Sequence, residues 1–205
     1  MANVECQVPY GIGRRKAVWG ARVGFVAALL TALAMMSSCS QAIRQGEGSS
    51  YLVITRIVGG ADSDATVESD VVADTGTVFT DVGSATLQLV MKDPGGPAPS
   101  PVNAITVTQY HVEYIRSDGR NTPGVDVPFP FSGGTSVTIN GTGSVDFTLV
   151  RVQAKLEAPL KALASGGGAA VISTVARVTF YGRDQAGREV SVTGNIDVTF
   201  ADWAG

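Results

Sequence analysis

Five carboxylates closely follow the pair Gly59-Gly60 and form a candidate set of metal ligands. They are Asp62, Asp64, Glu68, Asp70 and Asp74. Calcium prefers several oxygen ligands from flexible loops, and the Asp62-Ser-Asp64 order together with Asp70 could supply some of them. The segment lacks the Asp-x-Asp-x-Asp-Gly order and the closing glutamate of an EF-hand loop. Because runs of surface charge are usually solvated faces, a calcium site at Asp62, Asp64 and Asp70 is a hypothesis only.

Nucleophilic catalysis has little support in the sequence. It needs a nucleophile beside a base, usually histidine, and the chain contains a single histidine, His111, in the middle of a predicted strand. One histidine also supplies too few ligands for zinc. Paired carboxylates could hydrolyse a glycoside, but no spacing marks two of them as a pair. We therefore predict no catalytic residue and a protein that is not an enzyme. The alternative is a calcium-dependent accessory protein or a carboxylate-based hydrolase that uses the acidic loop 62–74.

Aromatic side chains could stack against sugars in a glycan-binding module. The candidates are Tyr110, Tyr114, Phe129, Phe131 and Tyr181. The prolines of the segment 127–131 hold Phe129 and Phe131 in an extended stretch. Burial of these two rings at one end of the domain is the favoured interpretation, because aromatic side chains gain much from burial.

The N-terminal region has the order of a secretory signal. A basic cluster at 14–16 precedes an apolar segment of about fourteen residues and then Ser37-Ser38-Cys39. A membrane-spanning helix needs about 20 apolar residues, and Arg22 interrupts any extension of this segment. Residues 36–39 resemble the lipobox of bacterial lipoproteins, although Met36 stands where that family prefers leucine. The resemblance implies a signal peptide over 1–38, lipid on Cys39 and an exported protein anchored to the membrane of the cell envelope. An uncleaved anchor is the alternative.

Removal of residues 1–38 would make the chain more acidic. That segment carries four basic residues and one acidic residue, so 11 basic and 17 acidic residues remain, a net charge near −6. Such a charge disfavours nucleic acid as a partner. The remaining Cys39 would carry lipid, which leaves no disulfide. We expect residues 39–50 to be the lipid-attachment site and a flexible tether, and residues 51–205 to be one domain.

The apolar residues after position 50 alternate with a period of two, which is typical of half-buried strands. The segments 172–181 and 190–200 predict a hairpin that turns at 184–187, with Gly187 supplying a positive φ angle. A second hairpin is expected to pair 135–139 with 144–150 through Asn140-Gly141. Further strands are expected at 51–58, 67–73, 85–92 and 104–116, the last with a β-bulge near Thr108. A short helix is expected within 157–164.

These elements predict an all-β fold, an antiparallel β-sandwich of about seven or eight strands preceded by an N-terminal hydrophobic signal helix. The region 51–203 resembles immunoglobulin-like and fibronectin type III-like domains, and residues 181–190 resemble the last hairpin of many bacterial immunoglobulin-like domains. The resemblance implies an architecture and no activity. We therefore expect a lipid-anchored, non-enzymatic module of the cell envelope that binds an unidentified protein or glycan, or serves as a structural subunit.

Overall fold

The computed structural model describes residues 48–60, 65–164 and 170–203, all within one unit, Arg44–Gly205. The expected signal peptide over 1–38 and the lipid-attachment residue Cys39 lie outside the described residues. Asp62 and Asp64 lie outside them as well. The first strand begins at Ser50, whose hydroxyl donates a hydrogen bond to the Asn103 carbonyl over 3.1 Å.

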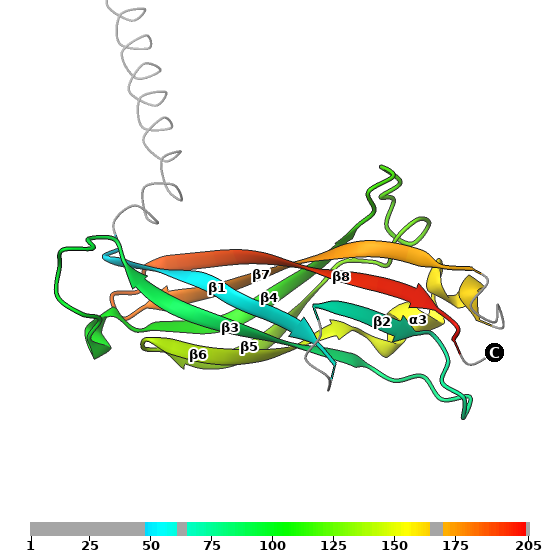
Figure 1. Ribbon diagram of the computed structural model, residues 1–205, viewed down its shortest axis with the longest axis horizontal. Helices are drawn as coiled ribbons and strands as arrows, with labels where there is room; N and C mark the ends of the chain where they lie inside the picture. Colours follow the sequence, from blue (N-terminus) through cyan, green and yellow to red (C-terminus); the bar gives the residue numbers. More distant parts are fainter. Residues whose placement is uncertain (1–47, 61–64, 165–169, 204–205) are drawn as a thin grey trace, which may run out of the picture. The chain divides into compact units, whose positions relative to one another are not determined.

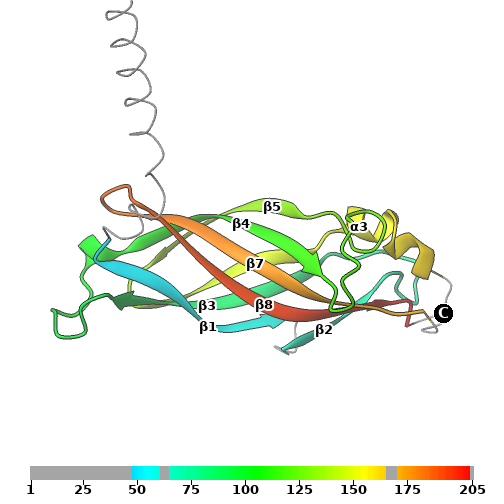
Figure 2. The same cartoon turned by 90° about the horizontal axis from the view of Figure 1, so that it is seen from above.

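Eight strands in two sheets make up most of the described chain (Figure 1). The three-stranded sheet has the order β1 (Ser50–Gly59), β3 (Asp81–Met91) and β6 (Thr142–Val150). The five-stranded sheet has the order β2 (Thr66–Asp70), β8 (Glu189–Ala201), β7 (Ile172–Asp184), β4 (Ile105–Ile115) and β5 (Phe131–Ile139). One of the sheets is curled into a half-barrel (Figures 1 and 2), and buried apolar side chains of both sheets form one core cluster. The predicted mostly β, two-sheet fold is confirmed.

The last hairpin and the bulge are where the sequence predicts them. β7 and β8 pair antiparallel from Ile172–Phe200 to Arg183–Glu189. Gly187 has a φ of 80°, and its amide donates a 2.9 Å hydrogen bond to the Asp184 carbonyl. The registers of β4 with β5 and with β7 both shift between Val107 and Gln109, so the bulge near Thr108 is confirmed.

The predicted pairing of β5 with β6 is wrong. β5 pairs with β4 in one sheet, whereas β6 pairs with β3 in the other. The reversal at Asn140-Gly141 is present, with Gly141 at a φ of 95°, and the Gly141 carbonyl accepts a 2.7 Å hydrogen bond from the Leu89 amide of β3. A turn signal sets where the chain reverses, but it does not decide which strand lies beside each arm. Here the chain passes from one sheet to the other at this turn.

One strand pair is parallel, so the prediction of a wholly antiparallel sandwich is wrong in this detail. β2 runs alongside the end of β8 from Thr66–Asp197 to Asp70–Ala201. In Figure 1, β1 and β2 point in the same direction, although β1 belongs to the three-stranded sheet. The chain thus changes sheets without reversing, and hydrophobic periodicity carries no information about strand direction.

The helical structure differs in detail from the prediction. An α-helix, α3 (Val152–Leu156), precedes the expected segment, and the segment 157–164 itself contains a 3-10 turn, η2 (Leu160–Leu163). Pro159 has no amide hydrogen to donate and interrupts a regular helix there. A second 3-10 turn, η1 (Pro101–Asn103), follows the proline-rich loop. Leu160 and Leu163 are buried, so η2 closes one end of the core.

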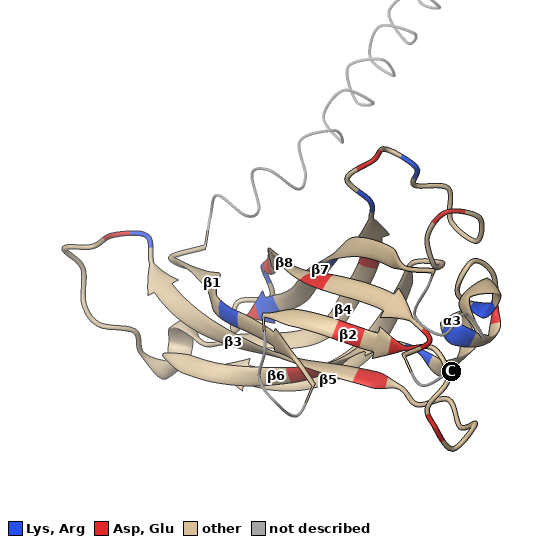
Figure 3. Cartoon of the chain, turned by 45° about the vertical axis from the view of Figure 1, so that its right-hand side comes forward, with Lys and Arg blue, Asp and Glu red and all other residues tan. Residues whose placement is uncertain are grey.

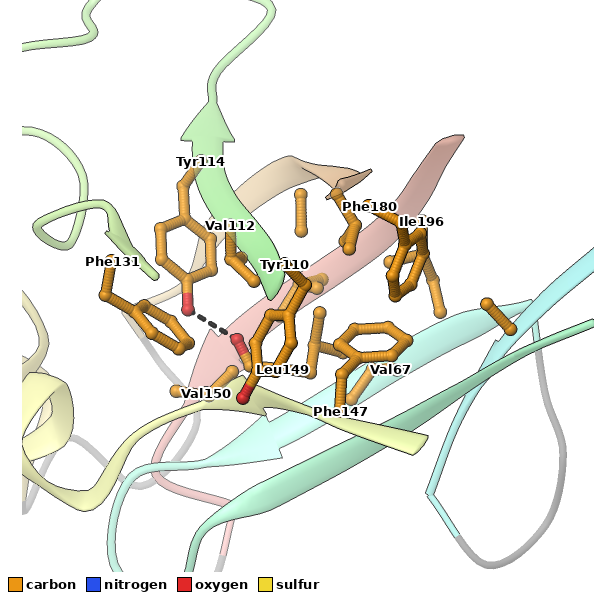
Figure 4. Packing of buried hydrophobic residues seen from close by; sticks show 14 of the residues in the cluster. Val67, Tyr110, Val112, Tyr114, Phe131, Phe147, Leu149, Val150, Phe180 and Ile196 are labelled. Carbon is orange, nitrogen blue, oxygen red and sulfur yellow. Dashed lines mark hydrogen bonds between the residues drawn. The ribbon is translucent and has the colours of Figure 1, made fainter. Parts of the chain in front are cut away.

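The core consists of the apolar faces that the alternation predicts, and Figure 4 shows part of it. Phe180 and Phe200 are completely buried. The Phe147 ring lies between Phe180 and Tyr110, with ring centroids 5.4 Å and 5.8 Å apart. Such edge-on and tilted arrangements are favoured between aromatic rings.

Two tyrosines of β4 join the sheets through their hydroxyl groups. The Tyr114 hydroxyl donates a hydrogen bond to the Leu149 carbonyl over 2.7 Å, the dashed line in Figure 4. The Tyr110 hydroxyl accepts a hydrogen bond from the Thr148 amide over 3.1 Å. Both acceptor and donor belong to β6, so each tyrosine spans the core and satisfies a backbone group of the opposite sheet.

Replacing Tyr114 by Phe is expected to lower the free energy of unfolding by about 1 kcal/mol, because the Leu149 carbonyl loses its donor. Burial and then the Asp81 charge raise the pKa of this phenol from its ordinary 10.0, against the opposing charge of Arg151. Because the Tyr114 phenol has a higher pKa in the folded than in the unfolded state, keeping its proton stabilises the fold. This stabilisation is fully present below the unfolded-state pKa and is lost as the pH rises above about 10. Urea unfolding at about pH 7 and pH 11 checks this. The variant should lose less stability between the two pH values than the native chain, and an equal loss would contradict the assignment.

Candidate functional site

The outward side of the five-stranded sheet carries a continuous set of polar side chains, here named the outer face. Its members, in chain order, are Thr106, Gln109, His111, Glu113, Ser132, Thr138, Arg177, Thr179, Tyr181, Arg183, Glu189, Ser191, Thr193 and Asn195. Each alternates with buried or partly buried residues of the same strand, because successive side chains of a strand point to opposite faces. The strands that bury the core therefore also place these polar groups side by side.

Hydrogen-bonding side chains form a row across four strands of the outer face. The strand registers align Thr193, Thr179, His111 and Ser132 in that order. The two threonine hydroxyls lie 2.9 Å apart, and His111 Nδ1 lies 3.0 Å from the Ser132 hydroxyl. Hydroxyl groups both donate and accept, so each paired hydroxyl keeps a further position for a ligand. The row can therefore bind a partner that presents many hydroxyl or amide groups.

The contact of His111 with Ser132 was not evident from the sequence, because the two residues belong to different strands. A serine beside a histidine is also the start of a catalytic pair. Catalysis further requires a group that orients the second ring nitrogen and donors for the oxyanion. Among the described residues, Ser132 is the hydrogen-bond partner found for His111. The pair therefore has one contact of the several that nucleophilic catalysis needs.

Charged residues on the outer face lie opposite residues of the other sign. Arg177 lies opposite Glu113, with Nη1 and Oε2 3.4 Å apart, and Arg183 lies opposite Glu189, with Nη2 and Oε1 3.3 Å apart. All four side chains are about half exposed or more, so each pair adds little stability. Figure 3 shows the acidic residues distributed over several strands. The pairs leave the centre of the outer face without a strong net charge.

The structure buries three of the five aromatic candidates and exposes the other two. Tyr110, Tyr114 and Phe131 are buried in the core, as the alternation of β4 and the start of β5 requires. Phe129 is 49% exposed, and its ring packs directly on Gly124 of the preceding loop. Tyr181 is 42% exposed and stands on the outer face in a row with Gln109 and Ser191. Of the five, Tyr181 is therefore the one placed for contact with a ligand on this sheet.

A shallow hollow of about 330 Å³ lies beside the outer face, where β2 adjoins β8. It is lined by Thr66, Ser117, Ser173, Thr174, Val175, Asp197 and Thr199. Five of these residues are serines or threonines. The Thr174 hydroxyl is buried and donates to the Val198 carbonyl, and the other four continue the hydroxyl-rich character of the outer face. Val175 and Tyr181 both point outward from β7 and are six residues apart, which is roughly 20 Å along a strand.

Asp70 is the described member of the predicted calcium site. One oxygen of its carboxylate accepts a 3.2 Å hydrogen bond from the Trp203 amide, and its carbonyl accepts a 2.7 Å hydrogen bond from Lys155 Nζ. Glu68 and Asp74 are exposed. Among the described residues, no three side chains of the metal-binding types lie close enough together to hold an ion. Asp70 instead connects the C-terminal residues and α3 to β2.

A buried lysine is the main charged feature that the sequence did not indicate. Lys155 of α3 is 2% exposed, and its Nζ lies 3.0 Å from both carboxylate oxygens of Asp81. The hydroxyl of the buried Ser69 donates to the same carboxylate. Lysine is almost never fully buried without a partner, and here the partners come from β2 and β3. Because every group of this cluster bonds to another protein group, we interpret it as structural.

Within the part of the chain that the structure describes, no helix has the length and apolar character needed to cross a membrane.

No family model and no curated protein matches the chain. Among solved structures, it is similar to the Pseudomonas fluorescens alkylpurine DNA glycosylase AlkC bound to DNA containing an abasic site analog. The match has 10% sequence identity and a TM-score of 0.31, and it covers 77% of this chain and 35% of the glycosylase chain. At this TM-score the match assigns the chain neither a family nor an activity.

Proposed function

We propose that this protein is a lipid-anchored, non-enzymatic binding module of the bacterial cell envelope, with lipid on Cys39 and ligand contacts on the outer face. The signal-like region before Cys39 supports export and anchoring. The outer face supports binding, since it places hydrogen-bonding side chains from four adjacent strands side by side. Sites on strands hold their side chains more precisely than sites on loops.

The strand order supports assignment to the immunoglobulin-like or fibronectin type III-like class. β1, β3 and β6 face β2, β8, β7, β4 and β5, and the first two strands are divided between the sheets. Such folds serve many unrelated functions, so the class itself does not specify a ligand. The function is therefore proposed from the outer face, whose paired hydroxyls and paired charges form a surface suited to recognition rather than a cleft suited to a reaction.

The experiment that tests this function combines fractionation with site-specific cross-linking in intact bacterial cells. We expect the native chain in the membrane fraction, and the Cys39→Ala variant neither labelled by radioactive palmitate nor retained there. A photo-reactive amino acid in place of Thr193, on the outer face, is expected to form a discrete adduct. The same amino acid in place of Gln88, which is exposed on the three-stranded sheet, is the matched control and should form none.

Each part of the proposal has an outcome that contradicts it. Palmitate labelling of the Cys39→Ala variant would show that the lipid is not on Cys39, and retention of an unlabelled variant in the membrane fraction would favour an uncleaved anchor. Equal adducts at the two positions, or an adduct at Gln88 alone, would exclude the outer face as the binding surface.

A further inference from the structure

Resting on the proposed function, we propose that the outer face binds a neutral glycan chain, with the Tyr181 ring as its stacking platform. The ring is 42% exposed on the sheet surface. In the same row of the sheet, Ser191 lies on one side, and Gln109 followed by Gly134 lies on the other. Two of these three neighbours, Ser191 and Gly134, have a short or absent side chain, so the ring is open to solvent on those sides. A flat aromatic side chain with a polar tip suits the apolar face of a sugar ring, because it buries that face and keeps its hydroxyl in water.

The polar groups around Tyr181 match the hydroxyl groups of a glycan. Thr179 and Thr193 lie in the next row, with His111 and Ser132 continuing it. Serine and threonine hydroxyls can donate and accept at once, as sugar hydroxyls do. Their mutual contacts of 2.9 Å and 3.0 Å orient the hydroxyls without using all of their bonding capacity. A ligand bearing many hydroxyls can therefore satisfy them without a specific charge.

The charges of the outer face favour a neutral ligand. Arg177 and Arg183 each lie beside a glutamate, so neither presents an isolated positive charge to an acidic polymer. Glu68 and Asp197, exposed at the β2 end of the sheet, add negative charge. A polyanion such as nucleic acid or a polyuronate would be repelled by these two carboxylates.

The composition of the outer face also favours a glycan over a protein. The buried centre of a protein interface is depleted in charge and enriched in aromatic residues, and overall more than half of such an interface is apolar. The outer face has Tyr181 as its one large aromatic side chain, among hydroxyl, amide and paired charged groups. A polar surface with a single exposed aromatic is better matched by a sugar chain.

The serine- and threonine-lined hollow near Val175 suggests that the ligand is an extended polymer. It lies on the same side of β7 as Tyr181, roughly 20 Å along the strand. A single sugar could contact one of these positions, whereas a chain laid along β7 could contact both.

Affinity electrophoresis tests this proposal with the purified full-length protein in detergent. The probes are three soluble neutral polysaccharides, hydroxyethylcellulose, arabinoxylan and dextran, and one polyuronate, alginate. We expect at least one neutral polymer to retard the native protein and alginate not to. Tyr181→Ala should weaken that binding by about ten-fold or more, the effect of losing a central aromatic anchor. Tyr181→Phe keeps the ring and should bind as the native protein does.

Tyr51 provides a matched control on the other sheet. It is 41% exposed, almost the same as Tyr181, and Tyr51→Ala should leave the retardation unchanged. The glycan proposal is overturned if no neutral polymer retards the native protein, if alginate binds more strongly, or if the two alanine variants lose binding equally. The adduct at the Thr193 position then separates the two proposals. A protein adduct there would support the binding module and contradict the glycan as its ligand. The absence of an adduct would contradict both proposals.

Discussion

Replacing Lys155 by Ala is expected to lower the free energy of unfolding by about 3–5 kcal/mol, the usual cost of breaking a buried ion pair. The ammonium group lies 2.7 Å from the Asp70 carbonyl and 3.0 Å from the Asp81 carboxylate. Its loss leaves Asp81 without its cation, and the lysine side chain also vacates space beneath α3. Since the Asp81 side chain is 21% exposed and water can reach it, we expect a value near the lower limit.

Thermal and urea unfolding measure this effect, with Lys161 as the matched control. Lys161 belongs to η2, a few residues further along the chain, and is exposed. Lys161→Ala should change the free energy of unfolding by less than about 0.5 kcal/mol. For a domain of this size, the Lys155→Ala variant should melt roughly 10 °C below the native chain. Similar melting temperatures for the two variants would show that Lys155 is not a buried structural charge.

A further pair of variants separates charge from packing at this position. Lys155→Met keeps most of the volume and removes the charge, and it should still be clearly destabilised because Asp81 stays unpaired. Adding Asp81→Leu to Lys155→Met should recover stability, since buried ion pairs can often be replaced by apolar residues without loss. A double variant less stable than Lys155→Met would contradict this account.

Replacing Gly133 by Ala is expected to destabilise the fold by about 1–3 kcal/mol, whereas the same change at its neighbour Gly134 is not. A Cβ atom on Gly133 would overlap the phenol ring of Tyr110. That ring cannot move aside easily, because its hydroxyl is bonded to the Thr148 amide and the ring packs at a tilt against Phe147. Relief of the overlap would therefore break the connection between the sheets or separate β5 from β4.

Gly134 is the internal control for this prediction. A Cβ atom there meets nothing within 4 Å, and its φ lies outside the positive region. Gly134→Ala should be neutral or stabilising by up to about 1 kcal/mol, because alanine restricts the unfolded chain more than glycine does. Urea unfolding of the two variants measures the difference, and equal stabilities would contradict the packing of Tyr110 against Gly133.

The parts of the fold that were predicted correctly depend on local sequence. Alternation along β7 and β8 indicated that Phe180 and Phe200 are buried, and Gly187 indicated their turn. The change of apolar parity near Thr108 indicated the bulge. In each case the side chains within a few residues decide which face is apolar or where the chain turns. Such signals need no knowledge of the neighbouring strand.

The errors concern which strands lie side by side. The Asn140-Gly141 signal correctly placed a reversal, but the arms of that reversal entered different sheets. The parallel contact of β2 with β8 joins segments more than a hundred residues apart, as between Thr66 and Asp197. Which edges meet depends on the packing of all the strands around one core, and no short segment contains that information.

The candidate site was predictable in part. Tyr181 was among the aromatic candidates, and its alternation with Phe180 placed it on the solvent face. Tyr110, Val112 and Tyr114 are alternate residues of one strand and therefore share a face, which indicated that the two tyrosine rings face the core. No local signal marked Lys155, because its partners Asp70 and Asp81 are 85 and 74 residues away in the sequence. The row of His111 with Ser132 and Thr179 likewise exists only because three strands align.

The sequence alone determined the mostly β character of this protein, the buried faces of β4, β7 and β8 and the turn at Gly187, because these follow from side-chain periodicity and backbone freedom. The tertiary structure decided the rest. It separated the aromatic residues into core and surface, buried Lys155 beside Asp81, and aligned hydroxyl groups from four strands into one face around Tyr181. These features depend on contacts between residues distant in the chain, and only the closure of two sheets on a common core brings such residues together.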